Sequence, residues 1–332
     1  MDILDRIGAL PPSVWCQAFF LGASAGILVL QNLPDDARGT LLNYGARRPE
    51  DRDKENRSIK EHEKRPNGGS RDKGSSTRSS ALMQIASVAS AAKVPHSWFW
   101  HFYLVSVSWS AFWAWQYVRR GAIMGSLAQA QVRSGPSASS MELGRVFFAW
   151  LMMALQGTRR LYECFFVVKP GRSPMLFAHW ALGIAFYTAM SISVWIHGSA
   201  AILESWETTV SAAFLKMLKT RIPATFAVIL GAWLKQNDCH RHLARLKKYT
   251  LPSQDMFAYF VCPHYTCECV IYLAISLMAA PEGAIFNKSV LCGLVFVAVN
   301  LGGTASGTKQ WYAQKFGAEK VAGRWKMIPF VF

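Results

Sequence analysis

Long apolar stretches alternate with shorter polar ones along most of the chain, and one long polar stretch interrupts them. A helix needs about 20 residues to cross a bilayer, and seven apolar stretches approach that length. The pattern therefore predicts an all-α integral membrane protein with about seven transmembrane helices. We expect these helices near residues 13–33, 96–118, 144–168, 176–198, 221–237, 256–279 and 286–303.

The polar stretch runs from Asp35 to Ser80 and is charged, rich in Gly and Ser, and almost free of large apolar residues. Such a segment cannot bury enough apolar surface to offset the entropy lost on folding. We therefore expect a disordered basic loop. It divides the chain into an N-terminal transmembrane helix (1–34), the loop (35–80) and a multi-helix membrane domain (81–332).

A soluble helical protein with a large apolar core is the alternative to a membrane protein. The chain is 52% hydrophobic and contains 13 Trp residues, and few soluble folds carry so many apolar runs of this length. Aromatic residues also lie near the ends of the predicted helices, where amphipathic rings favour the headgroup region. These residues include Trp98, Trp100, Trp115, Tyr117 and Trp233.

The formal net charge of +16 is unevenly distributed. If seven helices cross the membrane, 26 of the 36 Lys and Arg residues fall on one side, in Asp35–Ser80, Arg159–Arg172, Lys235–Lys248 and the tail after Gly303. Because Lys and Arg are enriched on the cytosolic side, we predict a lumenal N-terminus and a cytosolic C-terminus. No basic strip is interleaved with aromatic residues on a soluble face, so we expect no nucleic-acid partner.

Several familiar motifs are absent or incomplete. No G-x-G-x-x-G follows a strand-like run, and LGGTASGTK at 301–309 departs from the phosphate-loop pattern, so neither motif predicts a nucleotide site. The spacing of Cys262, Cys267 and Cys269 around His264 fits no common zinc pattern. We expect buried thiols and no metal. The glycosylation sequons at Asn56 and Asn287 fall in the predicted cytosolic loop and close to a membrane surface.

The segment CPHYTCECVIY, residues 262–272, places polar groups in an otherwise apolar stretch. On a helix, His264, Glu268 and Tyr272 follow one another at intervals of four residues and form one stripe, with Tyr265 beside it. Ionisable groups at membrane depth usually face a cavity, a ligand or a partner. The alternative is that His264 and Glu268 satisfy one another between helices.

Two further segments carry polar chemistry near the predicted cytosolic side. KQNDCHRHLARLKKYTLP, residues 235–252, combines amide, His and basic side chains that suit the phosphate and ribose oxygens of a dinucleotide. A plain basic cytosolic loop is the alternative. The tail, TKQWYAQKF followed by RWKMIPFVF, is apolar after a basic turn, which suggests a segment packed back on the helices.

Taken in order, CH…LARLKK…Y-x-LP, FAYFVCPHYTCECVIY and KQWYAQKF…KMIPFVF resemble the steroid 5α-reductase family, most closely its polyprenol/polyprenal reductase branch. The stretches VPHSWFWHFYLVSVSW and LQGTRRLYECFFV fit the same branch. The resemblance runs from about Val94 to the last residue, and residues 156–332 are the most family-like.

This resemblance implies a seven-helix enzyme of the endoplasmic reticulum membrane. It would use NADPH to saturate the α-isoprene unit of a long polyprenyl lipid on the way to dolichol, whose phosphate carries the glycan for protein N-glycosylation. Membrane lipids and the polyprenyl chain would be its partners. The family's cofactor positions fall on Gln236, His240, Lys247, Tyr249, His264, Glu268 and Tyr312.

The chain departs from the steroid enzymes at several of these places. They have Asn at the position of His264, Asp at that of His240 and Arg at that of Lys247. Their basic and His residues before the tail tyrosine are replaced here by Thr304 and Thr308. These changes affect the detailed cofactor contacts and leave the general class intact.

Chemistry narrows the substrate and the catalytic residues. A hydride adds readily to a carbon made electron-poor by a conjugated aldehyde, whose oxygen takes up the charge, so we expect polyprenal to be reduced in preference to polyprenol. The family's substrate-polarising Glu and Tyr have no clear counterpart. Among His101, Tyr103, Arg160 and Tyr162 we predict that His101 and Tyr162 are catalytic. The alternative for His101 is that it only lies at the membrane interface and takes no part in catalysis.

Two other functions stay open at this stage. The first is reduction of another conjugated substrate, such as a 3-oxo-Δ4 steroid or a trans-2-enoyl thioester. The second is a non-catalytic membrane scaffold or a transporter. The chain lacks paired Gly/Pro-broken helices in two matching halves, which many transporters have.

Overall fold

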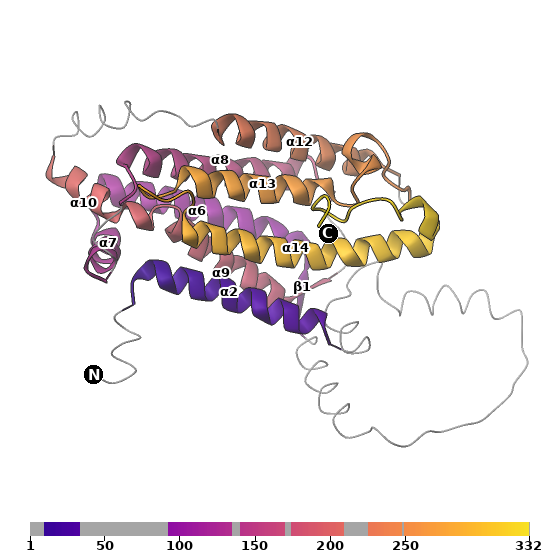
Figure 1. Cartoon of the computed structure of the whole chain (residues 1–332), viewed down its shortest axis with the longest axis horizontal. Coiled ribbons are helices and arrows are strands. Elements are labelled where there is room, and N and C mark those ends of the chain that lie inside the picture. Colours follow the sequence, from indigo (N-terminus) through magenta and orange to yellow (C-terminus); the bar gives the residue numbers. More distant parts are fainter. Residues whose placement is uncertain are drawn as a thin grey trace, which may run out of the picture.

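A computed structural model describes residues 10–33, 92–134, 140–169, 174–208, 225–247 and 249–331. The predicted loop at 35–80 and the sequon at Asn56 lie outside these ranges. The described residues are mostly helical (Figure 1). The long helices are α2 (Pro12–Gln31), α6 (Trp100–Val118), α8 (Leu143–Phe166), α9 (Phe177–Ser193), α12 (Thr225–Arg245), α13 (Pro263–Met278) and α14 (Lys288–Phe316).

Shorter elements connect the long helices. They are α7 (Ala122–Ser134), α10 (Ser199–Glu207), and the strands β1 (Lys93–Pro95) and β2 (Pro174–Leu176), with single 3-10 turns between them. The two strands pair antiparallel, with Val94 opposite Met175. This pairing joins the start of α6 to the start of α9.

Each predicted transmembrane stretch has a helix in the structure, but some boundaries differ. α13 starts only at Pro263, a favoured first helical residue, whereas the prediction began at 256. α14 continues to Phe316, well beyond the predicted end at 303. The prediction stopped where the apolar run ends, whereas the helix continues through the polar residues that follow. α7 and α10 were not predicted.

Within the described ranges, three helical stretches are long and apolar enough to cross a membrane: Pro12–Gln31, Phe177–Glu207 and Lys288–Phe316. They fit the membrane protein that the sequence predicts. The other helices of the bundle do not meet both conditions. α13 has only 16 residues, and α12 carries polar side chains between Lys235 and Arg245. Seven crossings and the orientation of the two termini stay predictions.

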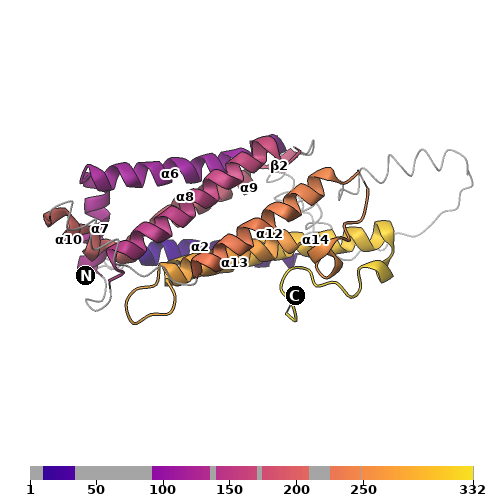
Figure 2. The same ribbon diagram turned by 90° about the horizontal axis from the view of Figure 1, so that it is seen from above.

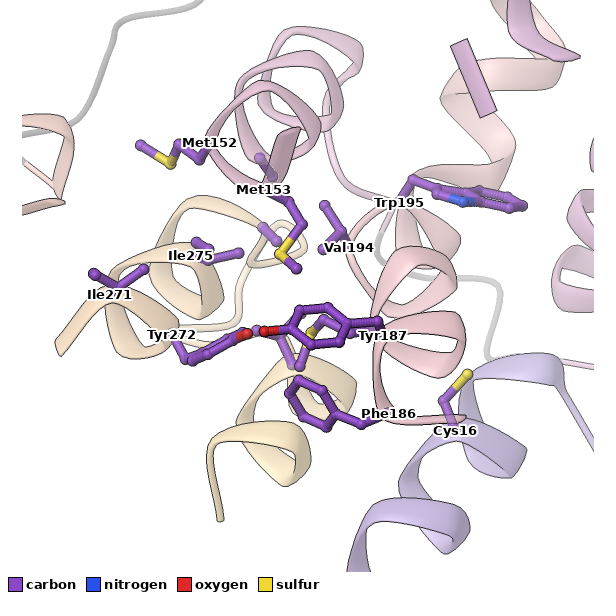
Figure 3. Close-up of a cluster of buried hydrophobic side chains, with 14 of the residues drawn as sticks. Cys16, Met152, Met153, Phe186, Tyr187, Val194, Trp195, Ile271, Tyr272 and Ile275 are labelled. Atoms are coloured by element: carbon purple, nitrogen blue, oxygen red, sulfur yellow. The ribbon is translucent and has the colours of Figure 1, made fainter. Parts of the chain in front are cut away.

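The long helices lie side by side in one bundle (Figures 1 and 2). α13 packs between α12 and α14, α2 lies against α14, and α6 contacts both α8 and α9. Apolar side chains from α8, α9 and α13 meet at the centre of the bundle (Figure 3). Met152, Met190, Ile271 and Ile275 are fully buried there. This packing fixes the positions of the polar side chains that share the same helices.

The chain after α14 folds back over the start of α13, as the sequence predicted. Trp325 donates its backbone N–H to Tyr259 at 2.9 Å and accepts one from Val261 at 2.8 Å. The Thr266 hydroxyl donates to the carbonyl of Met327, which is fully buried. The tail therefore stabilises the end of α13 that carries His264.

Asn287 holds the start of α14 and is fully buried. Its Oδ1 accepts from the backbone N–H groups of Ser289 and Val290 at 3.0 and 3.1 Å. Its Nδ2 donates to the carbonyl of Ser193 on α9 at 3.0 Å. The sequon at this position is thus part of the packed structure, and its side-chain amide is occupied.

We expect Asn287→Ala to lower the free energy of unfolding by roughly 2–4 kcal/mol. A lost N-cap costs about 1 kcal/mol, and a buried carbonyl left without its donor costs about 1–3 kcal/mol. Thermal unfolding of the purified protein in detergent measures the change. Asn32→Ala is the matched control because Asn32 is exposed at the end of α2 and bonds only within its own helix. Equal effects of the two variants would contradict this role for Asn287.

Candidate active site

A cavity of about 190 Å³ lies among six helices, with side chains from α6, α8, α9, α12, α13 and α14 in its walls. The stripe predicted on α13 faces it, since His264, Glu268 and Tyr272 all line the cavity together with Tyr265. This part of the sequence prediction is confirmed. The apolar lining comes mainly from Phe99, Phe102, Leu182, Phe186, Phe296 and Leu301.

One polar network supplies part of the lining, through Arg160, Gln236, His240 and Glu268, and continues behind the cavity wall. Its centre is Glu163 on α8, whose side chain is fully buried. Glu163 forms ion pairs with Arg159, at 2.6 Å, and with Arg160. It also accepts from Asn237 at 2.7 Å and lies 2.8 Å from His240 Nδ1, both on α12. The spacing of the arginines, three and four residues before Glu163, places all three on one helix face.

Arg160 connects this network to Tyr103 on α6. Its Nε and one terminal nitrogen donate to the Tyr103 hydroxyl oxygen at 3.1 and 2.8 Å. The guanidinium also lies over the Tyr103 ring, 4.8 Å from its centroid. Because the oxygen accepts both bonds, the hydroxyl proton of Tyr103 is free to be donated elsewhere. A buried cation beside a phenol makes that phenol a stronger donor.

Glu268 is the second carboxylate of the network. It accepts from Gln236 at 2.5 Å and from Gln156 at 3.2 Å. Arg159 in turn donates to the side-chain oxygens of Gln156 and Gln236. Two arginines and two glutamates therefore balance in formal charge, which reduces the cost of burying them.

His264 and Glu268 do not satisfy one another, so the alternative reading of the α13 stripe is wrong. The carboxylate of Glu268 bonds to the two glutamines instead. Nδ1 of His264 is buried and has no hydrogen-bond partner in the described part of the chain. Since buried polar atoms normally have partners, this nitrogen is available to a ligand.

The structure separates the predicted cofactor residues into two groups. Gln236, His240, His264 and Glu268 line the cavity. The others, Lys247, Tyr249 and Tyr312, do not line it. Lys315 Nζ lies 4.9 Å from the centroid of the Tyr249 ring, and Trp311 contacts both Tyr249 and Tyr312. Tyr249 and Tyr312 therefore lie around the C-terminal end of α14, and Lys247 is two residues before Tyr249 in the chain.

The two groups are connected through a small apolar cluster made of Val261, Cys262, Ala305 and Met327. Tyr265, which lines the cavity, and Tyr312, from the outer group, both pack against this cluster. The outer group is therefore adjacent to the cavity at the same end of α13. A ligand longer than the cavity could contact both.

The predicted catalytic residues His101 and Tyr162 lie away from the cavity lining. His101 packs between Trp98, Trp100 and Trp180 and accepts from the Trp180 indole at 3.3 Å. Tyr162 is half exposed and packs against Phe166. The residues two positions away, Tyr103 and Arg160, face the cavity instead, because two helical residues are about 200° apart around the axis.

Sequence reasoning missed several members of the network. Gln156, Arg159 and Glu163 were not singled out, although the pattern Q-x-x-R-R-x-x-E places four polar residues on one face of an apolar helix. Such a face is the signal that could have found them. In the described ranges, no group of three or more His, Cys, Asp or Glu side chains could hold a metal ion.

Comparisons with known proteins agree with these features. Residues 175–332 match the family described as 3-oxo-5-alpha-steroid 4-dehydrogenase. Polyprenal reductase 2 of Oryza sativa subsp. japonica is 27% identical over 311 residues, covering 78% of this chain and 86% of that protein. Polyprenal reductase 1 of Arabidopsis thaliana is 27% identical over 271 residues, covering 72% and 82%.

A vertebrate protein shows the same similarity. Polyprenal reductase of Xenopus laevis is 27% identical over 259 residues, covering 72% of this chain and 78% of its own length. The similarity thus reaches across plants and animals and extends beyond the residues that the family match covers. The resemblance seen in the sequence is confirmed: residues 175–332 match the steroid 5α-reductase family, most of the chain is similar to polyprenal reductases, and the protein is an oxidoreductase that acts on a carbon–carbon double bond.

Proposed function

We propose that the protein reduces the α-isoprene double bond of polyprenal with NADPH and so produces dolichal. In this role it is a multi-pass enzyme of the endoplasmic reticulum membrane, and it supplies the lipid that carries the glycan in protein N-glycosylation. One observation carries the proposal. The Tyr103 hydroxyl, held by Arg160, lies in a cavity whose remaining lining is largely apolar.

Tyr103 and Arg160 are the groups that would polarise the aldehyde. Hydride addition to the β-carbon of a conjugated aldehyde moves negative charge onto the carbonyl oxygen. A fixed donor at that oxygen stabilises the charge, and it does so more strongly in a buried site than in water. Tyr103 supplies the proton for this hydrogen bond, and the positive charge of Arg160 lies directly behind it.

The donors along the cavity fit a nicotinamide cofactor. His264 Nδ1 is buried without a partner, and Gln236, Asn300 and Thr304 contribute amide and hydroxyl groups to the lining. Lys247, Tyr249 and Tyr312, which are cofactor positions by the resemblance, would contact the phosphate and ribose groups, and Lys315 beside Tyr249 adds a positive charge there. When bound, NADPH supplies a hydride.

The size of the cavity limits what it encloses. Pockets for drug-sized ligands usually have volumes of about 300–1,000 Å³, whereas this cavity has about 190 Å³. We infer that it holds the reacting ends of the two ligands, with the rest of each outside. Gly183 lets the Phe102 ring of the lining pack closely against α9, because a Cβ at this position would lie 2.5 Å from that ring.

A second candidate is reduction of a 3-oxo-Δ4 steroid, because residues 175–332 match the 3-oxo-5-alpha-steroid 4-dehydrogenase family. It uses the same donor, since the steroid carbonyl is also conjugated. The relatives that cover most of the chain are polyprenal reductases, which favours the lipid aldehyde.

Purified protein in lipid discs tests the choice of substrate. It is incubated with NADPH or NADH and with polyprenal, polyprenol or a 3-oxo-Δ4 steroid, and the products are followed by mass spectrometry. We expect dolichal from polyprenal with NADPH as the preferred cofactor, and little reduction of polyprenol. Reduction of the steroid with no product from polyprenal would contradict the proposed substrate.

A further inference from the structure

Two buried tyrosines, Tyr187 on α9 and Tyr272 on α13, lie beside the Tyr103 site and line the same cavity. Tyr187 is 8% exposed and Tyr272 only 1%. Their hydroxyl groups point toward one another across the space between the two helices (Figure 3). The Tyr272 hydroxyl interacts with that of Tyr187 and has no other hydrogen-bond partner in the part of the chain that the structure describes. Buried hydroxyls normally make full use of their hydrogen-bonding groups, so this pair has capacity left for a ligand in the cavity.

Tyr187 is also in direct contact with the group that would bind the carbonyl oxygen. Its ring packs edge-on against that of Tyr103, with 5.7 Å between the centroids. In a conjugated aldehyde, one carbon separates the oxygen from the α-carbon. The group that protonates the α-carbon must therefore lie next to the group that binds the oxygen. Tyr187 meets this condition.

Three other polar side chains of the lining already have partners. The Glu268 carboxylate accepts hydrogen bonds from two glutamines, so it has no proton to donate to the substrate. The side-chain nitrogen of Gln236 donates to Glu268 and to the His264 carbonyl. His240 is bound to Glu163 behind the wall. Tyr187 and Tyr272 are the lining hydroxyls next to Tyr103 that have no such bond to a charged group.

We propose that Tyr187 protonates the α-carbon of the substrate and that Tyr272 is the positioning residue that holds and resupplies its proton. This inference rests on the proposed function, which supplies the hydride from NADPH. After hydride addition, the enolate electron pair forms a C–H bond at the α-carbon while the O–H bond of Tyr187 breaks. The O–H electron pair stays on the Tyr187 oxygen. That oxygen then takes the proton of Tyr272, and water restores the pair after product release.

Deuterium from the solvent tests this assignment. The parent protein reduces polyprenal in D2O with unlabelled NADPH, the dolichal is trapped at once with borohydride, and the configuration at the deuterated α-carbon is read by NMR of a chiral ester. A fixed donor delivers the deuteron to one face, so we expect a single configuration. Both configurations from the parent protein would overturn the proposal, and this measurement needs no variant.

Variants separate the roles of the two hydroxyls. A general acid contributes about 10²- to 10⁴-fold, so Tyr187→Phe should lower kcat by at least about 10²-fold and give both configurations, since solvent then protonates either face. Tyr272→Phe should slow turnover less and keep one configuration. Tyr259→Phe is the matched control, because Tyr259 is 64% exposed and lies outside the cavity lining.

The outcomes distinguish this inference from the proposed function. Tyr187→Phe at the parent's rate with a single configuration would overturn the role of Tyr187 and leave polyprenal reduction intact. A parent protein that does not reduce polyprenal would overturn the proposed function, and the role of Tyr187 with it.

Discussion

Glu163→Gln is expected to destabilise the protein by about 3–5 kcal/mol, the usual cost of removing one partner of a buried ion pair. The fully buried carboxylate balances Arg159 and Arg160 and also bonds to Asn237 and His240. Glutamine keeps the shape of the side chain but leaves the two guanidinium groups without their nearest counter-charge. Because Arg160 also holds Tyr103, activity should fall together with stability. The apparent unfolding temperature in lipid discs measures the first effect.

The control is a carboxylate-to-amide change in an exposed ion pair. Asp255 lies 3.3 Å from Lys235, and both side chains are more than half exposed. Such pairs contribute about 0–1 kcal/mol. The backbone of Asp255 has a positive φ of 51°, which asparagine tolerates well. Asp255→Asn should therefore shift the unfolding temperature little. A Glu163→Gln protein as stable as the Asp255→Asn protein would show that the network does not support the bundle.

Tyr103→Phe should reduce kcat on polyprenal by about 10²- to 10³-fold, the effect of removing one preorganised donor to a developing oxyanion. The KM for polyprenal should change little, since the phenyl ring keeps the shape of the cavity wall and the donor acts mainly after hydride addition. Steady-state kinetics in lipid discs provide both parameters. Retention of the unfolding temperature would show that the loss is chemical.

Tyr162→Phe makes the same chemical change on the residue that the sequence favoured. Its ring is half exposed beside Phe166 and does not reach the cavity. The geometry therefore predicts near-normal turnover for this variant. A large loss in Tyr162→Phe with none in Tyr103→Phe would restore the sequence-based assignment and contradict the site described above.

The sequence predicted the α13 stripe well, because a four-residue interval on a single helix needs no knowledge of the other helices. It failed to choose between His101 and Tyr103, or between Arg160 and Tyr162, for the opposite reason. The rotation of α6 and α8 about their axes decides which residue faces the cavity, and that rotation is set by packing against α9, α12 and α13. α6 is apolar on most sides, so its own pattern did not determine the rotation. α8 carries a polar face with Gln156, Arg160 and Glu163, and the prediction overlooked it.

The helix boundaries show a similar limit. The backbone of residues 259–262 pairs with the C-terminal tail, so α13 begins only at Pro263. Hydropathy alone predicted a helix that begins at residue 256. Likewise the polar end of α14 stays helical while its Trp311 and Tyr312 pack against neighbouring aromatic rings. Contacts between distant segments fix these ends, and one sequence does not display such contacts.

The proposed reaction is tested most directly by tracing the hydride. Purified protein in lipid discs is given polyprenal and NADPH deuterated on the transferable position of the nicotinamide, and the trapped product is examined by mass spectrometry and NMR. We predict one deuterium per molecule of dolichal, located on the β-carbon, and none on the carbonyl carbon. Deuterium on the carbonyl carbon, with the double bond intact, would mean that the protein reduces the aldehyde group and would contradict the proposed reaction.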